Sequence, residues 1–196
     1  RELDIEKAVA KTRYNSEGTT FIREYFVSAV DEVMAVKFEA KAKGKITLQA
    51  QLRRLGGENY SHYLDTIETT EDDMVILHGG SGSGGEESGI SFYGGLKLKV
   101  KGGNYRLLGE TFQVEKADEV IFLIGGATDF YHDSPKSVLK YQLGQTFNKE
   151  YNQIKEDHIN DYQKYFNRVS LDLGGEDLSH IPTDKRRKRL EDGKND

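Results

Sequence analysis

The glycine-rich stretch at residues 79–85 has the outward form of a nucleotide-binding motif, because it fits the pattern G-x-G-x-x-G from Gly80 to Gly85. A phosphate-binding loop of this kind needs a helix directly after it, since the phosphate is held at the helix N-terminus. Here the chain continues with Ile90-Ser91-Phe92, which is typical of a strand, and no G-K-[ST] occurs. We therefore predict a flexible loop between strands at this position.

The five histidines do not form a metal-binding pattern, because no pair has the i, i+4 spacing of a helical metal site. They are His62, His78, His132, His158 and His180. His132 precedes Asp133 beside a predicted helix start, where surface polar residues are common. His158 lies on the apolar side of a predicted helix, which favours a hydrogen-bonded core histidine. We predict no metal site.

Acidic residues are abundant, but no pair of them indicates a catalytic centre. Hydrolysis of a glycosidic bond needs two carboxyl groups on opposite sides of the scissile bond. Glu86-Glu87 lies in the glycine-rich stretch, with no apolar surround to raise a pKa, and Asp72-Asp73 predicts a turn. For Glu24, between aromatic residues, we expect an internal ion pair with an arginine. Since no G-x-S-x-G nucleophile motif occurs either, we predict no catalytic residue and no cofactor.

The composition favours an ordinary globular domain with neither nucleic acid nor a membrane as its partner. The chain has 196 residues, of which 36% are hydrophobic and 31% charged, and its net charge is -5. A mildly acidic chain has no general attraction to nucleic acid or to anionic membranes. No apolar stretch approaches the roughly 20 residues that span a bilayer. The basic run at residues 185–189 fits a solvated helix face.

Alternation of apolar and polar residues dominates the first two thirds and predicts strands at 46–53, 96–101 and 111–115, each with one face in water. Residues 120–124 are apolar on both faces, which suits a strand covered on both sides. Turns such as Glu17-Gly18 and Gly102-Gly103 separate roughly nine strands. We predict a mainly β fold, namely an antiparallel β-sandwich of two large sheets that is incomplete at its N-terminal edge, with most glycines in turns.

Helical periodicity appears only in the last third. Ser134-Pro135 is typical of a helix start, and it precedes a repeat of apolar residues every four positions. A second helix is predicted around His158. Residues 169–173 return to alternation and predict a short strand, after which Thr183 predicts the cap of a basic helix that ends at Gly193. The chain is thus predicted to consist of a β-sandwich domain at 1–133 and a helical connector at 134–196.

Four segments resemble, in their order and spacing, the N-terminal domain and connector of the α-L-fucosidase family of glycoside hydrolases whose catalytic domain is an (α/α)6 barrel. The first is residues 21–28 with Asp31 and Val33, the second GISFYGGLKLKVKGG at 89–103, and the third ADEVIFLIGGATDF at 117–130. The fourth, in the connector, comprises His158, Asp161, Tyr162, Phe166, Arg168, Val169, Leu171, Leu173, Gly174, Pro182, Thr183, Asp184 and Arg186. Phe21-Ile22 departs from the tyrosine and threonine that are commoner there.

The resemblance implies a parent enzyme that removes terminal α-L-fucosyl or α-L-galactosyl residues with inversion. This chain would be the enzyme's non-catalytic N-terminal domain, and it would lack the segment with which the family's domain begins. It would pack on a catalytic barrel, which we expect to begin after Asp196. No catalytic residue of the family has a counterpart here, so we carry none over. Glycan substrates lie outside the cell, and the resemblance therefore implies a secreted or periplasmic protein.

Two further expectations concern other roles and partners. The alternative function is a stand-alone carbohydrate-binding or structural module, although the chain has 11 Tyr and 9 Phe but no Trp, the best platform for a sugar ring. Its partners would be the parent's barrel and a glycan. We also expect self-association through an exposed sheet edge, because a chain that begins inside a strand pattern leaves an edge unpaired.

Overall fold

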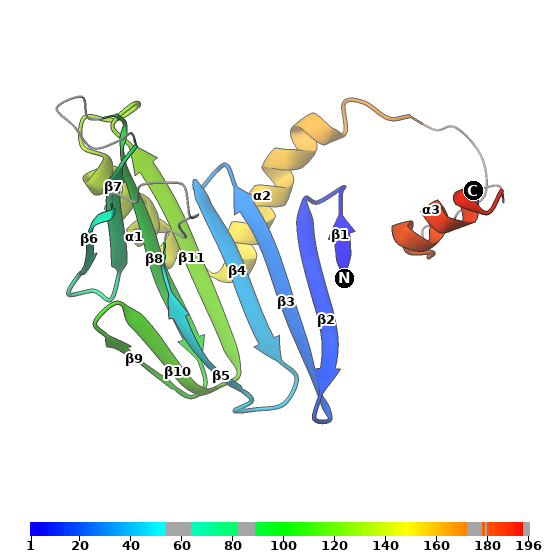
Figure 1. Cartoon of the computed structure of the whole chain (residues 1–196), viewed down its shortest axis with the longest axis horizontal. Helices are drawn as coiled ribbons and strands as arrows, with labels where there is room; N and C mark the ends of the chain where they lie inside the picture. Colours follow the sequence, from blue (N-terminus) through cyan, green and yellow to red (C-terminus); the bar gives the residue numbers. More distant parts are fainter. Residues whose placement is uncertain (54–63, 82–88, 172–177, 179, 194–196) are drawn as a thin grey trace. The chain divides into compact units, whose positions relative to one another are not determined.

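A large antiparallel sheet forms the centre of the protein (Figure 1). The computed structural model describes residues 1–53, 64–81, 89–171, 178 and 180–193. In spatial order, the strands of this sheet are β1 (Glu2–Asp4), β2 (Val9–Ser16), β3 (Thr19–Ser28), β4 (Val33–Ala40), β11 (Glu119–Thr128), β8 (Ser91–Lys101), β7 (Val75–Gly80) and β6 (Leu64–Thr69). All neighbouring strands pair antiparallel.

Two different layers cover the two faces of this sheet. On one face lies a three-stranded antiparallel sheet in the order β5 (Ile46–Gln51), β10 (Thr111–Ala117) and β9 (Asn104–Leu108). On the other face, α1 (Pro135–Phe147) contacts β11 and β8, while α2 (Tyr151–Phe166) contacts β3. The predicted mainly β, antiparallel fold is confirmed. The second β layer, however, has three strands in the described part of the chain, where we expected a second large sheet.

Residues 1–166 form one compact unit, which includes both of these helices, and residues 167–196 form a second unit. The second unit contains α3 (Thr183–Glu191). The predicted domain boundary at residue 133 stays a prediction. Among the described residues, no helix is both long and apolar enough to cross a membrane.

Strand β11 is buried on both of its faces, as its sequence predicts. Val120 and Phe122 point into the core beneath the small sheet, and Ile121 and Leu123 point into the core beneath the helices. A strand buried on both faces can be apolar at every position, whereas a half-exposed strand alternates. The two cores of the unit therefore meet at β11.

Helix α1 packs on a strip of glycines inside the sheet. Gly95 of β8 pairs with Gly125 of β11, and both lie beneath the side chains of Leu139 and Leu143. A Cβ atom at Gly95 would stand 2.6 Å from a methyl group of Leu143, so only glycine admits the helix at this depth. The expectation that most glycines occupy turns overlooked this strip and the neighbouring pair Gly94 and Gly126, which faces the other side of the sheet.

Lysines that the alternation of β8 placed in water are instead partly covered by the helical layer. The side chain of Lys97 is only 8% exposed, pairs with Asp72 and lies 4.4 Å from the ring centroid of Phe147. Lys99 donates a hydrogen bond to the Lys149 carbonyl oxygen at 2.6 Å. Burial lowers the pKa of Lys99. The prediction of a water-facing side for β8 is therefore wrong at Lys97, because long side chains can bury their stems and still find a charged partner.

The predicted turns and the predicted start of α1 are present, whereas the predicted cap of the last helix is not. Glu17 and Gly18, which link β2 to β3, have φ values of 47° and 74°, as hairpin turns of this type require. Ser134 is the N-cap residue of α1 and Pro135 is its first residue, as predicted, although the Ser134 side chain makes no capping bond. Thr183 is the first residue of α3, and the N-cap of that helix is Pro182. Residues 169–171 form no strand, and the rest of that predicted strand, at 172–173, lies outside the described residues.

The glycine strip yields a test of how α1 is held. Gly95→Ala should lower the free energy of unfolding by about 1–3 kcal/mol, because the new methyl group overpacks the contact with Leu143. Gly144→Ala is the matched control, since a Cβ atom there meets no atom within 4 Å. It should instead stabilise by roughly 0.5–1 kcal/mol through helix propensity. Urea unfolding of both variants measures the difference, and equal effects would contradict this packing.

Candidate functional site

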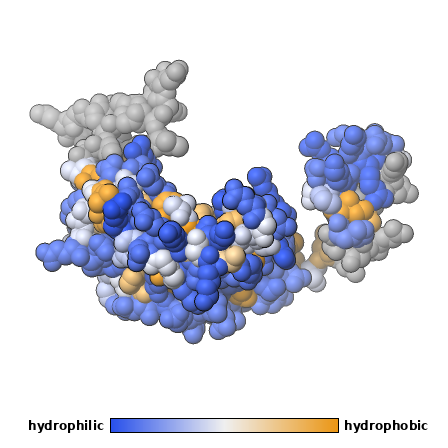
Figure 2. Space-filling view, turned by 90° about the horizontal axis from the view of Figure 1, so that it is seen from below, coloured by the Kyte–Doolittle hydropathy of each residue, from blue (hydrophilic) through white to orange (hydrophobic). Residues whose placement is uncertain are grey.

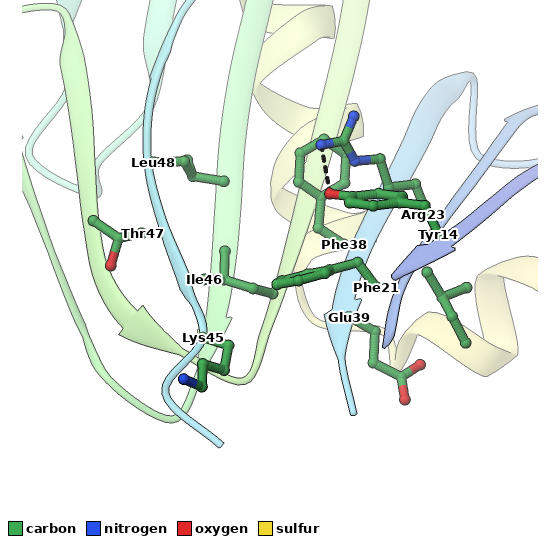
Figure 3. A pocket seen from close by; sticks show the side chains of 10 residues that line it. Tyr14, Phe21, Arg23, Phe38, Glu39, Lys45, Ile46, Thr47 and Leu48 are labelled. Atoms are coloured by element: carbon green, nitrogen blue, oxygen red, sulfur yellow. Dashed lines mark hydrogen bonds between the residues drawn. The ribbon is translucent and has the colours of Figure 1, made fainter. Parts of the chain in front are cut away.

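A groove lies where the small sheet ends and the large sheet continues (Figure 3). We call it the aromatic groove; its lining residues are Tyr14, Phe21, Ile22, Arg23, Phe38, Glu39, Lys45, Ile46, Thr47 and Leu48. It holds about 160 Å³. One wall is β5 and the other is formed by β2, β3 and β4, so hairpin pairing and sheet packing together create it.

Arg23 lies between two aromatic rings on the sheet wall of the groove. Its guanidinium carbon is 5.1 Å from the ring centroid of Tyr14 and 4.7 Å from that of Phe38. Its Nη2 atom donates a hydrogen bond to the Tyr14 hydroxyl at 3.0 Å, and Tyr14 stacks on Phe21 with centroids 5.3 Å apart. Such cation–π contacts hold the guanidinium in place, and among the described residues only the Tyr14 hydroxyl accepts a hydrogen bond from its donors.

Glu24 points to the opposite face of the sheet, where it binds lysines and not the arginine that the sequence predicted. Lys155 of α2 donates to both carboxylate oxygens of Glu24 at 3.1 and 3.0 Å, and the Tyr151 hydroxyl donates at 3.2 Å. Burial raises the pKa of Glu24, but Lys155, Lys37 and Tyr151 outweigh it, so the pKa is lowered overall. Glu24 is thus held as a carboxylate, the opposite of what a general acid needs.

A second ion-pair cluster joins the start of α2 to the turn after β3. Lys149 contacts Asp31 at 2.7 Å and Asp157 at 3.1 Å. The hydrogen bonds to Asp31 and then to Asp157 raise the pKa of Lys149. Asp31 is buried and also accepts a hydrogen bond from the Ser28 hydroxyl at 2.8 Å. The buried carboxylates of the described chain, Glu24 and Asp31, therefore tie helix α2 to the sheet.

An aromatic pocket lies at the ends of β8 and β11, and we call it the rim pocket. It holds about 380 Å³ and is lined by Phe92, Tyr93, Gly126, Ala127, Thr128, Tyr131 and His132. Tyr131 is 79% exposed and meets Phe130 edge to face. Asp129, which follows Thr128 of the lining, accepts a hydrogen bond from the Ser91 backbone N–H at 3.0 Å. Exposed rings beside polar groups can bind a sugar ring.

The remaining sequence candidates fall at separate places. His158 is buried, stacks on Phe26 and contacts the carbonyl oxygens of Lys7 and Ala8, which confirms the predicted core histidine. Asp72 and Asp73 form the predicted turn before β7, and Asp72 binds Lys97. Glu86-Glu87, His62 and most of the glycine-rich stretch lie outside the described residues. Within the described part, no group of three or more acidic, histidine or cysteine residues is placed to hold a metal ion.

Sequence reasoning found neither the aromatic groove nor the rim pocket. Tyr14, Arg23 and Phe38 are far apart in the chain and meet only through the register of β2, β3 and β4. Aromatic residues in alternating strands are also typical of a core, so their pattern does not reveal where the covering layer stops. The T-F-I-R-E-Y-F pattern does place Arg23 and Glu24 on opposite faces, and this was the available signal.

These contacts and the fold define an antiparallel β-sandwich domain backed by two helices. The chain belongs to the family described as Glycosyl hydrolase family 65, N-terminal domain, whose family model matches residues 1–133. Residues 150–196 match the model of the Glycosyl hydrolase family 95 catalytic domain. That second match begins close to the start of α2, well before the point after Asp196 where we expected the catalytic part to begin.

Two known proteins are similar to this chain. Alpha-L-fucosidase 2 of Arabidopsis thaliana is 27% identical over 203 residues, which cover 89% of this chain and 23% of that protein. A solved structure, a putative kojibiose phosphorylase from the human microbiome, aligns with a TM-score of 0.59 at 10% identity over 84% of this chain and 24% of its own. That likeness shows the fold alone. The predicted relationship to α-L-fucosidases is confirmed, and the chain spans about a quarter of the length of each relative.

The lowered pKa of Glu24 gives a pH-dependent test. A carboxyl whose folded pKa is depressed stabilises the fold above its unfolded pKa of about 4.3, and this contribution is lost as the pH falls through the folded pKa. Glu24→Gln should therefore cost about 2 kcal/mol of unfolding free energy at neutral pH. The difference in unfolding free energy between Glu24→Gln and the unaltered chain should become smaller as the pH falls. Urea unfolding over a series of pH values measures this.

The control for this test is Glu115→Gln, because the ion pair of Glu115 with Arg106 is exposed on both sides. Exposed ion pairs contribute little to stability, so Glu115→Gln should lower the free energy of unfolding only slightly at every pH. If Glu24→Gln lowered the free energy of unfolding by the same amount in acid as at neutral pH, Glu24 would not stabilise the fold through its charge.

Proposed function

We propose that this chain is the non-catalytic N-terminal domain of a glycoside hydrolase that removes terminal α-L-fucosyl or α-L-galactosyl residues. One observation carries the proposal: the buried carboxylates of the described chain, Glu24 and Asp31, are each paired with a lysine. A glycosidase needs two carboxyl groups beside an open sugar site, with one of them protonated. Paired carboxylates beneath a helix offer neither access nor a transferable proton.

In this proposal, the domain supports the catalytic barrel of the parent enzyme. The match of residues 150–196 to a catalytic-domain model supports this role, because it begins in the helical layer that the sheet itself stabilises. The name of the relative Alpha-L-fucosidase 2 supports fucose as the sugar. A secreted or periplasmic location is part of the same proposal, since glycan substrates lie outside the cell.

The proposal predicts where fucose release occurs. A released-fucose assay on a fucosylated oligosaccharide should give no product with the 196-residue chain, and it should give product with a full-length polypeptide that contains this chain. Glu24→Gln in the full-length polypeptide should lower stability without abolishing release. Release by the isolated chain would refute a non-catalytic role, and we would then examine Glu24, Asp129 and His132, which share no described contact.

The rim pocket favours a second candidate function, a carbohydrate-binding module. Calorimetric titration of the chain with L-fucose and with a fucosylated oligosaccharide tests it. If the rim pocket binds sugar, Tyr131→Ala should abolish the heat, because an exposed ring supplies the stacking surface. Tyr141→Ala is the control, since Tyr141 is a similarly exposed tyrosine on α1. Absence of heat with the unaltered chain would exclude this candidate.

A further inference from the structure

The small sheet is narrower than the large sheet beneath it, and it ends at β5. Among the described residues, β5 pairs only with β10, so the backbone groups of its other edge have no strand partner. The aromatic groove lies directly against that edge, because Ile46, Thr47 and Leu48 of β5 form one of its walls. An unpaired edge and an adjoining apolar trough together have the shape of a vacant strand position.

Strand β5 carries few of the features that normally protect an edge, although its pairing with β10 has a register shift between Val114 and Ala117. From Ile46 to Gln51 it contains neither a charge nor a proline, and its exposed positions are Thr47, Gln49 and Gln51. Edge strands that must stay unpaired usually carry lysine, proline or a bulge. The edge β1 of the large sheet differs, because it has three residues of which two are acidic. The chemistry of β5 therefore favours an additional strand.

The small sheet covers only part of the large-sheet face that forms the floor of the aromatic groove. Val36 and Phe122, under the small sheet, are buried, whereas Phe21, Tyr25 and Phe38 are only partly buried and Tyr14 is 36% exposed. All of these side chains share one face of the large sheet, as the strand register requires. The apolar side chains of an added strand would complete this core.

Charge in the groove selects an acidic occupant. Arg23 makes one described hydrogen bond, to Tyr14, and forms no ion pair among the described residues. The nearby carboxylate of Glu39 is already bound by Lys41 and Lys37, and these contacts lower its pKa. A guanidinium that lies over two rings presents its remaining donors for a carboxylate.

We propose that the aromatic groove binds an extended polypeptide strand, which pairs with the free edge of β5. Every second side chain of this strand faces the large sheet, where apolar side chains contact Phe21 and Phe38 and one carboxylate, at another of these inward positions, reaches Arg23. A second copy of this chain is a poor occupant, because its own β5 lies over a large sheet that would collide with β3 and β2. A single strand without a second layer avoids that collision.

The probe for this proposal is the acetylated and amidated peptide Thr-Val-Thr-Asp-Thr-Val, labelled for fluorescence polarisation, in which both valines and the aspartate point to the same face. The full 196-residue chain should bind it saturably, and hydrogen–deuterium exchange should show slower exchange of residues 46–51 with the peptide bound. A peptide with proline at its second and third residues should not bind, because one of these two adjacent residues must donate a ladder N–H to β5. A peptide with lysine in place of aspartate should bind more weakly.

Arg23→Gln should weaken the binding of the aspartate peptide about tenfold, or about 1.4 kcal/mol. Arg13→Gln is the matched control, because Arg13 is exposed on the neighbouring strand and belongs to the opposite face from Tyr14. Thermal melting of each variant establishes that it is folded. A lack of saturable binding, equal loss in both variants, or protection at β1 or β6 in place of β5 would overturn the proposal. So would a concentration-dependent dimer with protected β5 edges, which would assign the groove to a second copy.

Discussion

The burial of β11 on both faces is the constraint on which the rest of the structure depends. Because its side chains point alternately into two cores, each face of the sheet must be covered by its own layer. A strand left open on either side would expose a row of large apolar residues to water, at a cost of about 1.5–3 kcal/mol for each. The small sheet and the helical layer meet this requirement from opposite sides.

The two covering layers are attached by different physical means. The small sheet is held by apolar contact, with Phe112, Val114 and Ala117 packed into the core that it shares with β11. Helix α2 is also held by ion pairs, through Lys155 to Glu24 and Lys149 to Asp31. Buried ion pairs add little net stability but strongly penalise any arrangement that separates them. They therefore fix where α2 lies on β3 more than how firmly it is bound.

Much of the fold could be predicted from the sequence, because its signals are local. Alternation found most strands, the apolar run at 120–124 identified the strand with two buried faces, and glycines at positive φ marked the turns. The layer over the far face could not be predicted in this way. Lys97 has the pattern of a solvent-facing residue, and it is buried because α1 brings Phe147 over it. The glycine strip similarly depends on the pairing of two distant strands.

The sites were less predictable than the fold, since each depends on where a layer ends. Arg23 and Glu24 are sequence neighbours with opposite environments, one open to the groove and one sealed beneath α2. Alternation along β3 assigns Arg23 and Glu24 to different faces of the sheet, but it does not show which face a second layer covers. The sequence therefore does not predict which of the two side chains is buried.

Arg23 also explains how the chain can keep an aromatic face partly open to water. A leucine at this position would extend the apolar strip of Tyr14 and Phe38 and favour indiscriminate association. Arginine packs its planar group on both rings and still offers hydrogen-bond donors to solvent. This aromatic face therefore stays in contact with water. The guanidinium donors of Arg23 favour a covering group that can accept hydrogen bonds. A strand that brings a carboxylate replaces that water with a charge-assisted hydrogen bond, whereas a purely apolar strand would leave the guanidinium buried without a partner.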